Sequence, residues 1–235
     1  MVFEKLEKRL ILEGVIEAVT PLHIGAGKPE MEIEEVDMPI LRAPDGVPYI
    51  PGSSLKGKLR SELEKIAKAK GLEVCTPPNV NDMCGASKRS PQDLCIGCRV
   101  FGTAGRSLSV ASKVKLRDAY PLEPVEAMLE RHGTAIDRST GTVSRAALYK
   151  TEAVPAGTRF GFELVAENLE EDELRYLKAA LKSVEDSALG GASSRGFGKI
   201  RFALETLRER GPGYYLGEEP DKVLEGEKLK QWLQT

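Results

Sequence analysis

Apolar and polar residues alternate in four segments of the chain, with the period of two that is typical of strands. The four segments are residues 9–20, 107–120, 158–167 and 199–207. The first of them, RLILEGVIEAVT, is also rich in branched apolar side chains. A short hairpin is expected over residues 40–51, because the Asp45-Gly46 pair suits a tight turn. The alternation therefore predicts four strands and one small hairpin.

Two other segments have apolar residues at every third or fourth position, which predicts amphipathic helices. The helix over residues 52–71 has the apolar stripe Leu55, Leu59, Leu63 and Ile66. The later helix has the stripe Leu174, Leu177, Leu181 and Val184. We expect Ser53 or Ser54 to cap the first helix. Asn168 and Glu171 are expected to form a capping box at the second.

The predicted order of elements is strand, helix, strand, strand, helix, strand, which is the ferredoxin-like pattern of an α+β fold. We expect one domain over residues 1–208, with a cysteine-rich insert at 72–106 that lacks periodicity. Residues 209–235 are expected to form a C-terminal tail. Its apolar residues Leu224, Leu229 and Trp232 could pack on a neighbouring molecule or on the chain's own core.

Composition and charge narrow the function classes. The 235 residues are 41% hydrophobic and 30% charged, as in a globular protein, and the formal net charge is −2. A site for a polyanion must therefore be local, with cations gathered on one face. No apolar run is long enough for a membrane span, and the first residues do not resemble a signal peptide, so we expect a cytoplasmic chain with no membrane partner.

The first predicted helix begins with cations, although helix starts favour acids. Lys56 and Arg60 are four residues apart and share one side of the helix. Together with the hydroxyls of Ser53 and Ser54 and the free backbone N–H groups, they could bind a phosphate. The alternative is an ordinary solvated surface.

The segment LGGASSRGFGKIRF, residues 189–202, places glycines beside cations. Arg195, Gly196 and Lys199 are the residues expected to contact a phosphate chain, because glycine lets backbone N–H groups approach closely. The segment does not fit the nucleotide-binding motif G-x-x-x-x-G-K-[ST] in either register, which argues against a nucleotide triphosphatase. A long turn without a ligand is the alternative.

Four cysteines, Cys75, Cys84, Cys95 and Cys98, lie in the insert and are separated by eight, ten and two residues. In a cytoplasmic chain, cysteines indicate metal binding or reduced thiols more than disulfides. Four thiolates complete a structural zinc site, and a metal would order a segment that has no core of its own. We therefore expect one structural zinc ion. Free buried thiols remain the alternative.

Several longer motifs stand out in the chain: LHIGAGK, VDMPILRAPDGVPYIPGSSLKGKLRSELE, IDRSTG followed by ALYKTEAVPAGTRFGFEL, and GGASSRGFGKI. Together these motifs resemble the RAMP superfamily. Within this superfamily, the chain is most similar to the repeated backbone subunit of type III CRISPR effector complexes, of the Csm kind. The resemblance covers roughly residues 8–205.

The resemblance implies a modified RRM-like, ferredoxin-like core with a thumb hairpin within about residues 118–150. It implies partners too: guide RNA, target RNA, further copies of the chain and other effector subunits. It places a catalytic aspartate at Asp37, which would act with Mg²⁺ or another divalent cation to cleave target RNA at regular intervals. His23 is expected to contact the guide.

Three alternatives remain at this stage. The chain could be an RNA-binding scaffold of the same kind of complex without catalytic activity. It could be a free-standing RNA-binding protein with a zinc module. His23 and His132, the only two histidines, could also serve as acid and base of a metal-independent ribonuclease if the fold brings them together. Asp37 itself could be one more solvated acid beside Glu32, Glu34 and Glu35.

Overall fold

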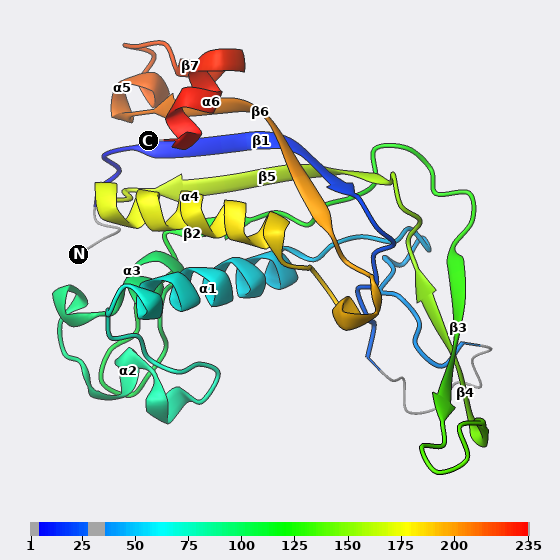
Figure 1. Cartoon of the computed structure of the whole chain (residues 1–235). Coiled ribbons are helices and arrows are strands. Elements are labelled where there is room, and N and C mark those ends of the chain that lie inside the picture. The colour runs from blue at the N-terminus through cyan, green and yellow to red at the C-terminus, as the bar shows by residue number, and fades with distance from the viewer. Residues whose placement is uncertain (1–4, 28–35, 235) are drawn as a thin grey trace.

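The computed structural model describes residues 5–27 and 36–234. A five-stranded antiparallel sheet in the order β2-β5-β1-β6-β7 forms its centre (Figure 1). The strands are β1 (Arg9–Ala18), β2 (Val114–Leu116), β5 (Arg159–Glu167), β6 (Ile200–Arg210) and β7 (Lys222–Glu225). Three of the four predicted strands thus have nearly the expected bounds. The strand expected over 107–120 is reduced to the three residues of β2.

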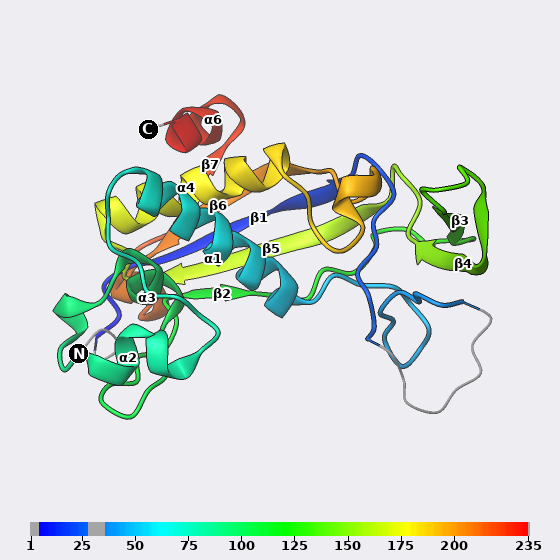
Figure 2. The same cartoon turned by 60° about the horizontal axis from the view of Figure 1, so that its bottom comes forward.

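Two long helices cover one face of this sheet, as Figure 2 shows most clearly. They are α1 (Gly52–Ala69) and α4 (Glu171–Asp186). The predicted apolar stripes face the core: Leu55, Leu59 and Leu63 are each at most 1% exposed. Each such burial contributes about 1.5–3 kcal/mol relative to an exposed side chain. The mixed α+β class is therefore confirmed.

Both helix starts differ from the prediction. The N-cap of α1 is Pro51, with no side-chain cap, so neither Ser53 nor Ser54 caps the helix. The Asp118 carboxylate instead accepts a hydrogen bond of 2.8 Å from the Gly52 backbone N–H. At α4, the capping box joins Glu170 and Glu173 rather than Asn168 and Glu171. Asn168 has a left-handed backbone, with φ of +50°.

The cysteine-rich segment forms a separate small module next to α1. It contains two short α-helices, α2 (Cys84–Ser87) and α3 (Ile96–Phe101), and two single-turn helices, Val80–Asp82 and Pro91–Asp93. The module has its own small cluster of buried side chains, which includes Cys84, Leu94 and Cys98. Its cysteines therefore form part of its core.

A two-stranded hairpin projects from the other end of the molecule (Figures 1 and 2). Its strands are β3 (Leu129–Ile136) and β4 (Val143–Ala153), which form a two-stranded antiparallel sheet with a register shift between Thr134 and Ile136. Ile136, Val143 and Leu148 are exposed on it. The hairpin lies where the resemblance to the RAMP superfamily placed a thumb.

The C-terminal residues pack on the chain's own core. They comprise α5 (Pro212–Tyr215), β7 and α6 (Gly226–Gln234). Leu229 is 2% exposed, and Leu224 and Trp232 pack against the main core. The sequence left open whether this tail packs on a neighbouring molecule or on the chain's own core, and in the structure it packs on the core. Within the described residues, no helix has the length and apolar character needed to cross a membrane.

Candidate nucleic-acid interface and metal site

The glycine-rich loop between α4 and β6 packs directly on His23. The Gly191 N–H donates a hydrogen bond of 2.8 Å to the His23 carbonyl oxygen. Gly190 has a φ of +79°, and a Cβ atom built on it would lie 2.3 Å from the same carbonyl oxygen. Only glycine combines this left-handed backbone with so close an approach. The glycines therefore fix the loop against the segment that carries His23.

The His23 ring is buried, with 7% of the residue exposed. Its Nδ1 lies 2.7 Å from the carbonyl oxygen of Glu152 in β4. A carbonyl oxygen can only accept, so Nδ1 must carry the proton. In the neutral ring, Nε2 is then the acceptor. His132 lies on β3 and is exposed, whereas His23 is held by β4 and the glycine loop.

Arginines connect the glycine-rich loop to the hairpin. The Arg195 guanidinium lies 5.1 Å from the centre of the Tyr149 ring, at cation–π distance. Arg131 of β3 donates to the Arg195 carbonyl oxygen at 3.1 Å and lies 4.5 Å from the centre of the Phe197 ring. Gly196 has a φ of +87°, with open space where a side chain would be. Arg195 and Lys199 are exposed.

Asp37 lies beside β4 of the hairpin. Its carboxylate accepts a hydrogen bond of 2.7 Å from the Lys150 backbone N–H, and the next residue, Met38, forms a parallel bridge with Thr151. Asp37 is exposed. Glu32, Glu34 and Glu35, which the sequence placed near it, lie outside the described residues.

Glu152 holds the segment after Asp37 in place, although it was not among the predicted site residues. Its carboxylate accepts from the Ile40 N–H at 3.0 Å and pairs with the Arg42 guanidinium. Its backbone N–H donates to the Met38 carbonyl oxygen at 3.0 Å, while its own carbonyl oxygen binds His23. Glu152 thus links the segment after Asp37 to His23. The contacts are long-range in sequence, which is why no local motif reveals them.

The start of α1 presents Ser53 and Lys56. Ser53 is exposed, and Ser54 and Lys56 are half-buried. Burial of the Lys56 ammonium and, next, repulsion from Arg60 lower the pKa of Lys56. A phosphate beside Lys56 would favour its charged form. In Figure 1, the start of α1, the glycine-rich loop and the hairpin lie toward the same end of the molecule.

Arg60 has different surroundings. Its guanidinium donates to the Glu64 carboxylate at 2.7 Å, to the Gly102 carbonyl oxygen at 3.1 Å and to the Cys98 sulfur at 3.3 Å. The side chain is 14% exposed. The structure therefore groups Arg60 with the cysteine module.

The four cysteines converge. Their sulfur atoms all lie within 4.8 Å of one another, and Cys75 and Cys98 are 3.3 Å apart. All four are free thiols, and Cys84 and Cys98 are buried. In a tetrahedral site with Zn–S bonds of 2.3 Å, the sulfur atoms are about 3.8 Å apart. Among the described residues, these four form the one cluster of potential metal ligands. The donor set and spacing fit a tetrahedral thiophilic ion.

Without a cation, the four sulfurs cannot all be ionised. A hydrogen bond from Cys98 is the main cause that lowers the pKa of Cys95, to about 4. Burial raises the pKa of Cys84 to about 11, and the hydrogen bond to Cys95 raises that of Cys98. Ionisation of one thiol therefore opposes ionisation of the neighbouring thiols until a cation supplies positive charge.

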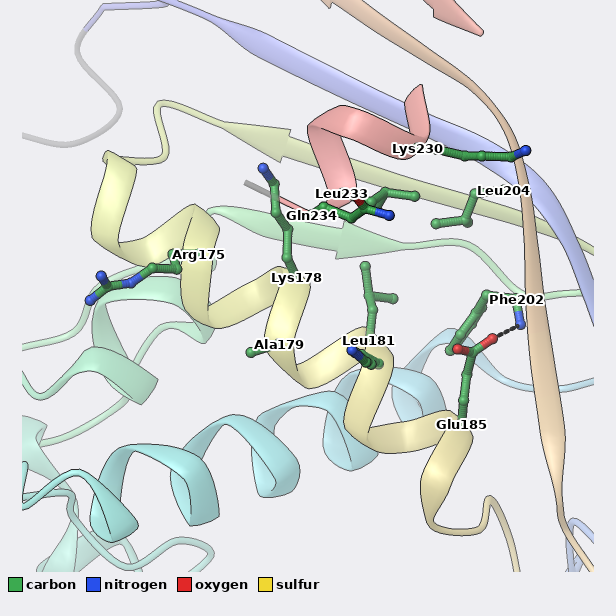
Figure 3. Close-up of a pocket in the computed structure, with 11 residues that line it drawn as sticks. Arg175, Lys178, Ala179, Leu181, Glu185, Phe202, Leu204, Lys230, Leu233 and Gln234 are labelled. Atoms are coloured by element: carbon green, nitrogen blue, oxygen red, sulfur yellow. Dashed lines mark hydrogen bonds between the residues drawn. The ribbon is translucent and has the colours of Figure 1, made fainter. Parts of the chain in front are cut away.

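A groove between α4, β6 and α6 is distinct from both sites (Figure 3). It has a volume of about 520 Å³. Its floor is apolar, and Lys178, Lys182 and Lys230 lie along it. Lys178 donates to the Trp232 carbonyl oxygen, and Lys230 pairs with Glu227. Lys178 therefore joins α4 to α6, whereas Lys230 is paired within α6.

Sequence relatives cover almost the whole chain. It is 35% identical to the "CRISPR system Cms endoribonuclease Csm3" of Methanothermobacter thermautotrophicus, over 94% of each chain. It is also 35% identical to the protein of the same name from Methanocaldococcus jannaschii, over 92% of this chain and 88% of that one.

Solved structures are similar as well. A chain of the Csm3–Csm4 subcomplex of a type III-A CRISPR-Cas interference complex aligns with a TM-score of 0.60 at 29% identity, over 97% of this chain and 95% of that one. The fold is also that of Methanopyrus kandleri Csm3, with a TM-score of 0.65 at 23% identity, over 97% and 96% of the two chains. A model of the RAMP superfamily matches residues 15–201. With this match and its Csm3 relatives, the chain belongs to the RAMP superfamily and is a RAMP of the Csm type.

Proposed function

We propose that this chain is the backbone subunit of a type III CRISPR effector complex, in which it binds guide RNA and cleaves complementary target RNA. The similarity to Csm3 endoribonucleases over nearly the whole chain carries this proposal. The partners would be guide and target RNA, further copies of the chain and other subunits of the complex. The similarity to a chain of a Csm3–Csm4 subcomplex supports an assembly of this kind.

The guide would lie across the end of the molecule that holds the glycine-rich loop. Arg195, Gly196 and Lys199 are exposed there and can approach phosphates. Ser53, Ser54 and Lys56 at the start of α1 would supply further hydroxyls and a cation. His23 would offer Nε2 as an acceptor, since Nδ1 is held by Glu152. Arg60 is not part of this proposal, because its donors are directed to the cysteine module.

Asp37 would be the catalytic residue. Its exposed carboxylate is fixed by the Lys150 N–H, which orients it without burying it. Among the described residues, Asp37 belongs to no group of three or more potential metal ligands. Mg²⁺ commonly takes one or two carboxylates and completes its shell with water and phosphate. A divalent ion held by Asp37 and RNA would stabilise charge on the phosphate that reacts.

The four cysteines would hold a structural zinc ion with no open coordination position. Four thiol ligands with tetrahedral spacing are the donors that Zn²⁺ takes in structural sites. The zinc supplies the positive charge that lets all four sulfurs ionise, and it would order a module whose own apolar cluster is small. The site has no part in the cleavage step.

We also infer that the core is a modified ferredoxin-like, RRM-like fold. The strand order β2-β5-β1-β6, with α1 and α4 on one face, supports this arrangement. The β3–β4 hairpin would be the thumb that contacts RNA. We place the complex in the cytoplasm, where the guide and target RNAs of such a system meet.

The test is to co-express the chain with its genomic neighbours, purify it and sequence the RNA that remains bound. We expect short RNAs with a uniform 5′ end and a shared repeat-derived tag. RNA fragments of random sequence would instead indicate a general RNA-binding protein. A complex that carries guide RNA but leaves a matched target intact would identify a scaffold without catalytic activity.

A further inference from the structure

Arg60 of α1 makes two contacts with the cysteine module and one with Glu64 of its own helix. The Nη2 atom donates to the Cys98 sulfur at 3.3 Å, and Nη1 donates to the Gly102 carbonyl oxygen at 3.1 Å. Glu64, one turn later in α1, accepts from Nε at 2.7 Å. These contacts span both ends of α3, because Cys98 lies in its first turn and Gly102 follows its last residue. The guanidinium therefore binds the segment that contributes Cys95 and Cys98.

Glu64 also contacts this segment directly. A Cβ atom on Gly97 would lie 2.8 Å from the Glu64 carboxylate oxygen, so the residue between Ile96 and Cys98 must be small. Glu64 is 9% exposed, and its side chain is fixed by Arg60. The C-x-x-C segment is thus packed against the Arg60–Glu64 ion pair of α1, which is largely buried. These contacts distinguish Arg60 from a solvated surface cation, which has no fixed protein partners.

The positive charge of Arg60 would offset the negative charge of the metal site. A divalent ion with four thiolate ligands carries a net charge of −2, which is costly in a partly buried module. An N–H···S hydrogen bond from a guanidinium offsets part of that charge and orients the sulfur lone pair. Outer-shell partners of this kind commonly set metal affinity by a factor of about 10–100.

We propose that Arg60 is a positioning residue of the cysteine metal site, and that with Glu64 it fixes the metal-binding module to α1. This inference rests on the proposed zinc site. Arg60 acts through the Cys98 sulfur and does not itself bind the ion. The helix that it joins to the metal site is the one whose start carries Lys56.

The experiment is a titration of the purified full chain with Co²⁺ and then Zn²⁺, in wild type and two Arg60 variants. Co²⁺ reports the number of thiolate ligands through its charge-transfer and ligand-field bands. We expect Arg60→Gln to bind Zn²⁺ about 10–100-fold more weakly and to shift the thiolate-to-cobalt band. Arg60→Lys keeps the charge but loses the forked donors of the guanidinium. Its affinity for Zn²⁺ should therefore lie between those of wild type and Arg60→Gln. Lys65→Gln is the control, because Lys65 is itself exposed and pairs with Glu62 of the same helix.

The possible outcomes distinguish the role of Arg60 from the zinc site itself and from the proposed function. A wild-type chain without a tetrathiolate cobalt spectrum would overturn the zinc site and this role of Arg60 together. A normal wild-type spectrum, with Arg60→Gln unchanged in band position and affinity, would overturn the role of Arg60 alone. If Arg60→Gln does not fold, Arg60→Lys decides, and wild-type affinity and spectrum in that variant would refute the proposal. The RNA-sequencing test of function does not depend on these results.

Discussion

The Gly191 N–H and the His23 carbonyl oxygen form a hydrogen bond of 2.8 Å that joins two segments far apart in the sequence. The same His23 is bound through its ring to Glu152 of β4. The glycine-rich loop is therefore not a free turn between α4 and β6. It is fixed at the root of the β3–β4 hairpin, and its shape there depends on residues that lack a side chain.

Replacement of Gly190 by alanine is expected to damage this loop. Gly190 has a φ of +79°, and an added Cβ would lie 2.3 Å from the His23 carbonyl oxygen. Gly157 has a φ of +88° with no atom within 4 Å of such a Cβ, so it is a matched control. The left-handed backbone alone costs about 1–2 kcal/mol in both variants. Thermal unfolding should show a further loss of about 1–3 kcal/mol in Gly190→Ala only. Equal losses in the two variants would contradict the packing described here.

Removal of one cysteine should unfold the module around it. Cys98 is fully buried, and its sulfur lies between Cys75 and Arg60. We expect Cys98→Ser to lose bound zinc and to lower Tm by several degrees, since about 1 kcal/mol corresponds to 2–4 °C at this size. A strong chelator should have the same effect on wild type and no added effect on the variant. Elemental analysis well below one zinc per wild-type chain would count against the site.

The salt dependence of guide binding should report the phosphate contacts. Each cation that binds phosphate of a single strand adds about −0.7 to the slope of log affinity against log salt. Arg195→Gln and Lys56→Gln should each make the slope shallower by about that amount. Lys182→Gln is the control, because this exposed lysine lines the groove between α4, β6 and α6 and is not a residue of the proposed interface. An unchanged slope in Arg195→Gln would remove Arg195 from the interface.

Stability should fall in acid partly through Glu62, which joins α1 to α4 by accepting from Ser183 at 2.8 Å. Burial raises the pKa of Glu62, but hydrogen bonds from Lys58, Lys65 and Ser183 outweigh it and lower the pKa from 4.5 to about 2. Because the folded pKa is the lower one, the stabilisation is complete above pH 4.5 and is lost as the pH falls toward 2.

Denaturant unfolding at several pH values checks this assignment. The Glu62→Gln variant should lose less stability than wild type between pH 5 and pH 2, by on the order of 1–3 kcal/mol. Glu227→Gln is the control, because Glu227 forms an exposed pair with Lys230. Parallel stability curves for wild type and Glu62→Gln would show that Glu62 is not the group responsible.

Local patterns predicted the long elements, while contacts between distant residues decided the rest. The apolar stripes of α1 and α4 were sufficient to predict both helices and their buried faces. The cap of α1 was missed because its acceptor, Asp118, is 66 residues away. The same limit applies to the sites. The sequence predicts Arg60 as a cation that could bind phosphate, and only the fold brings Cys98 to it. Glu152 lies within one of the motifs that resemble the RAMP superfamily, but its partners Ile40 and Arg42 are 112 and 110 residues away.

The most direct test of the central claim is target cleavage by the assembled complex with wild-type chain or with Asp37→Asn. We expect wild type to cut a matched RNA at regular intervals in the presence of Mg²⁺, and the variant to be slower by at least about 100-fold. Guide binding should be unchanged, because the Lys150 N–H can still donate to the amide oxygen of the variant. Asp45→Asn, in the turn at residues 43–47, should cleave normally. Full cleavage by Asp37→Asn would contradict the assignment of Asp37 as the catalytic residue.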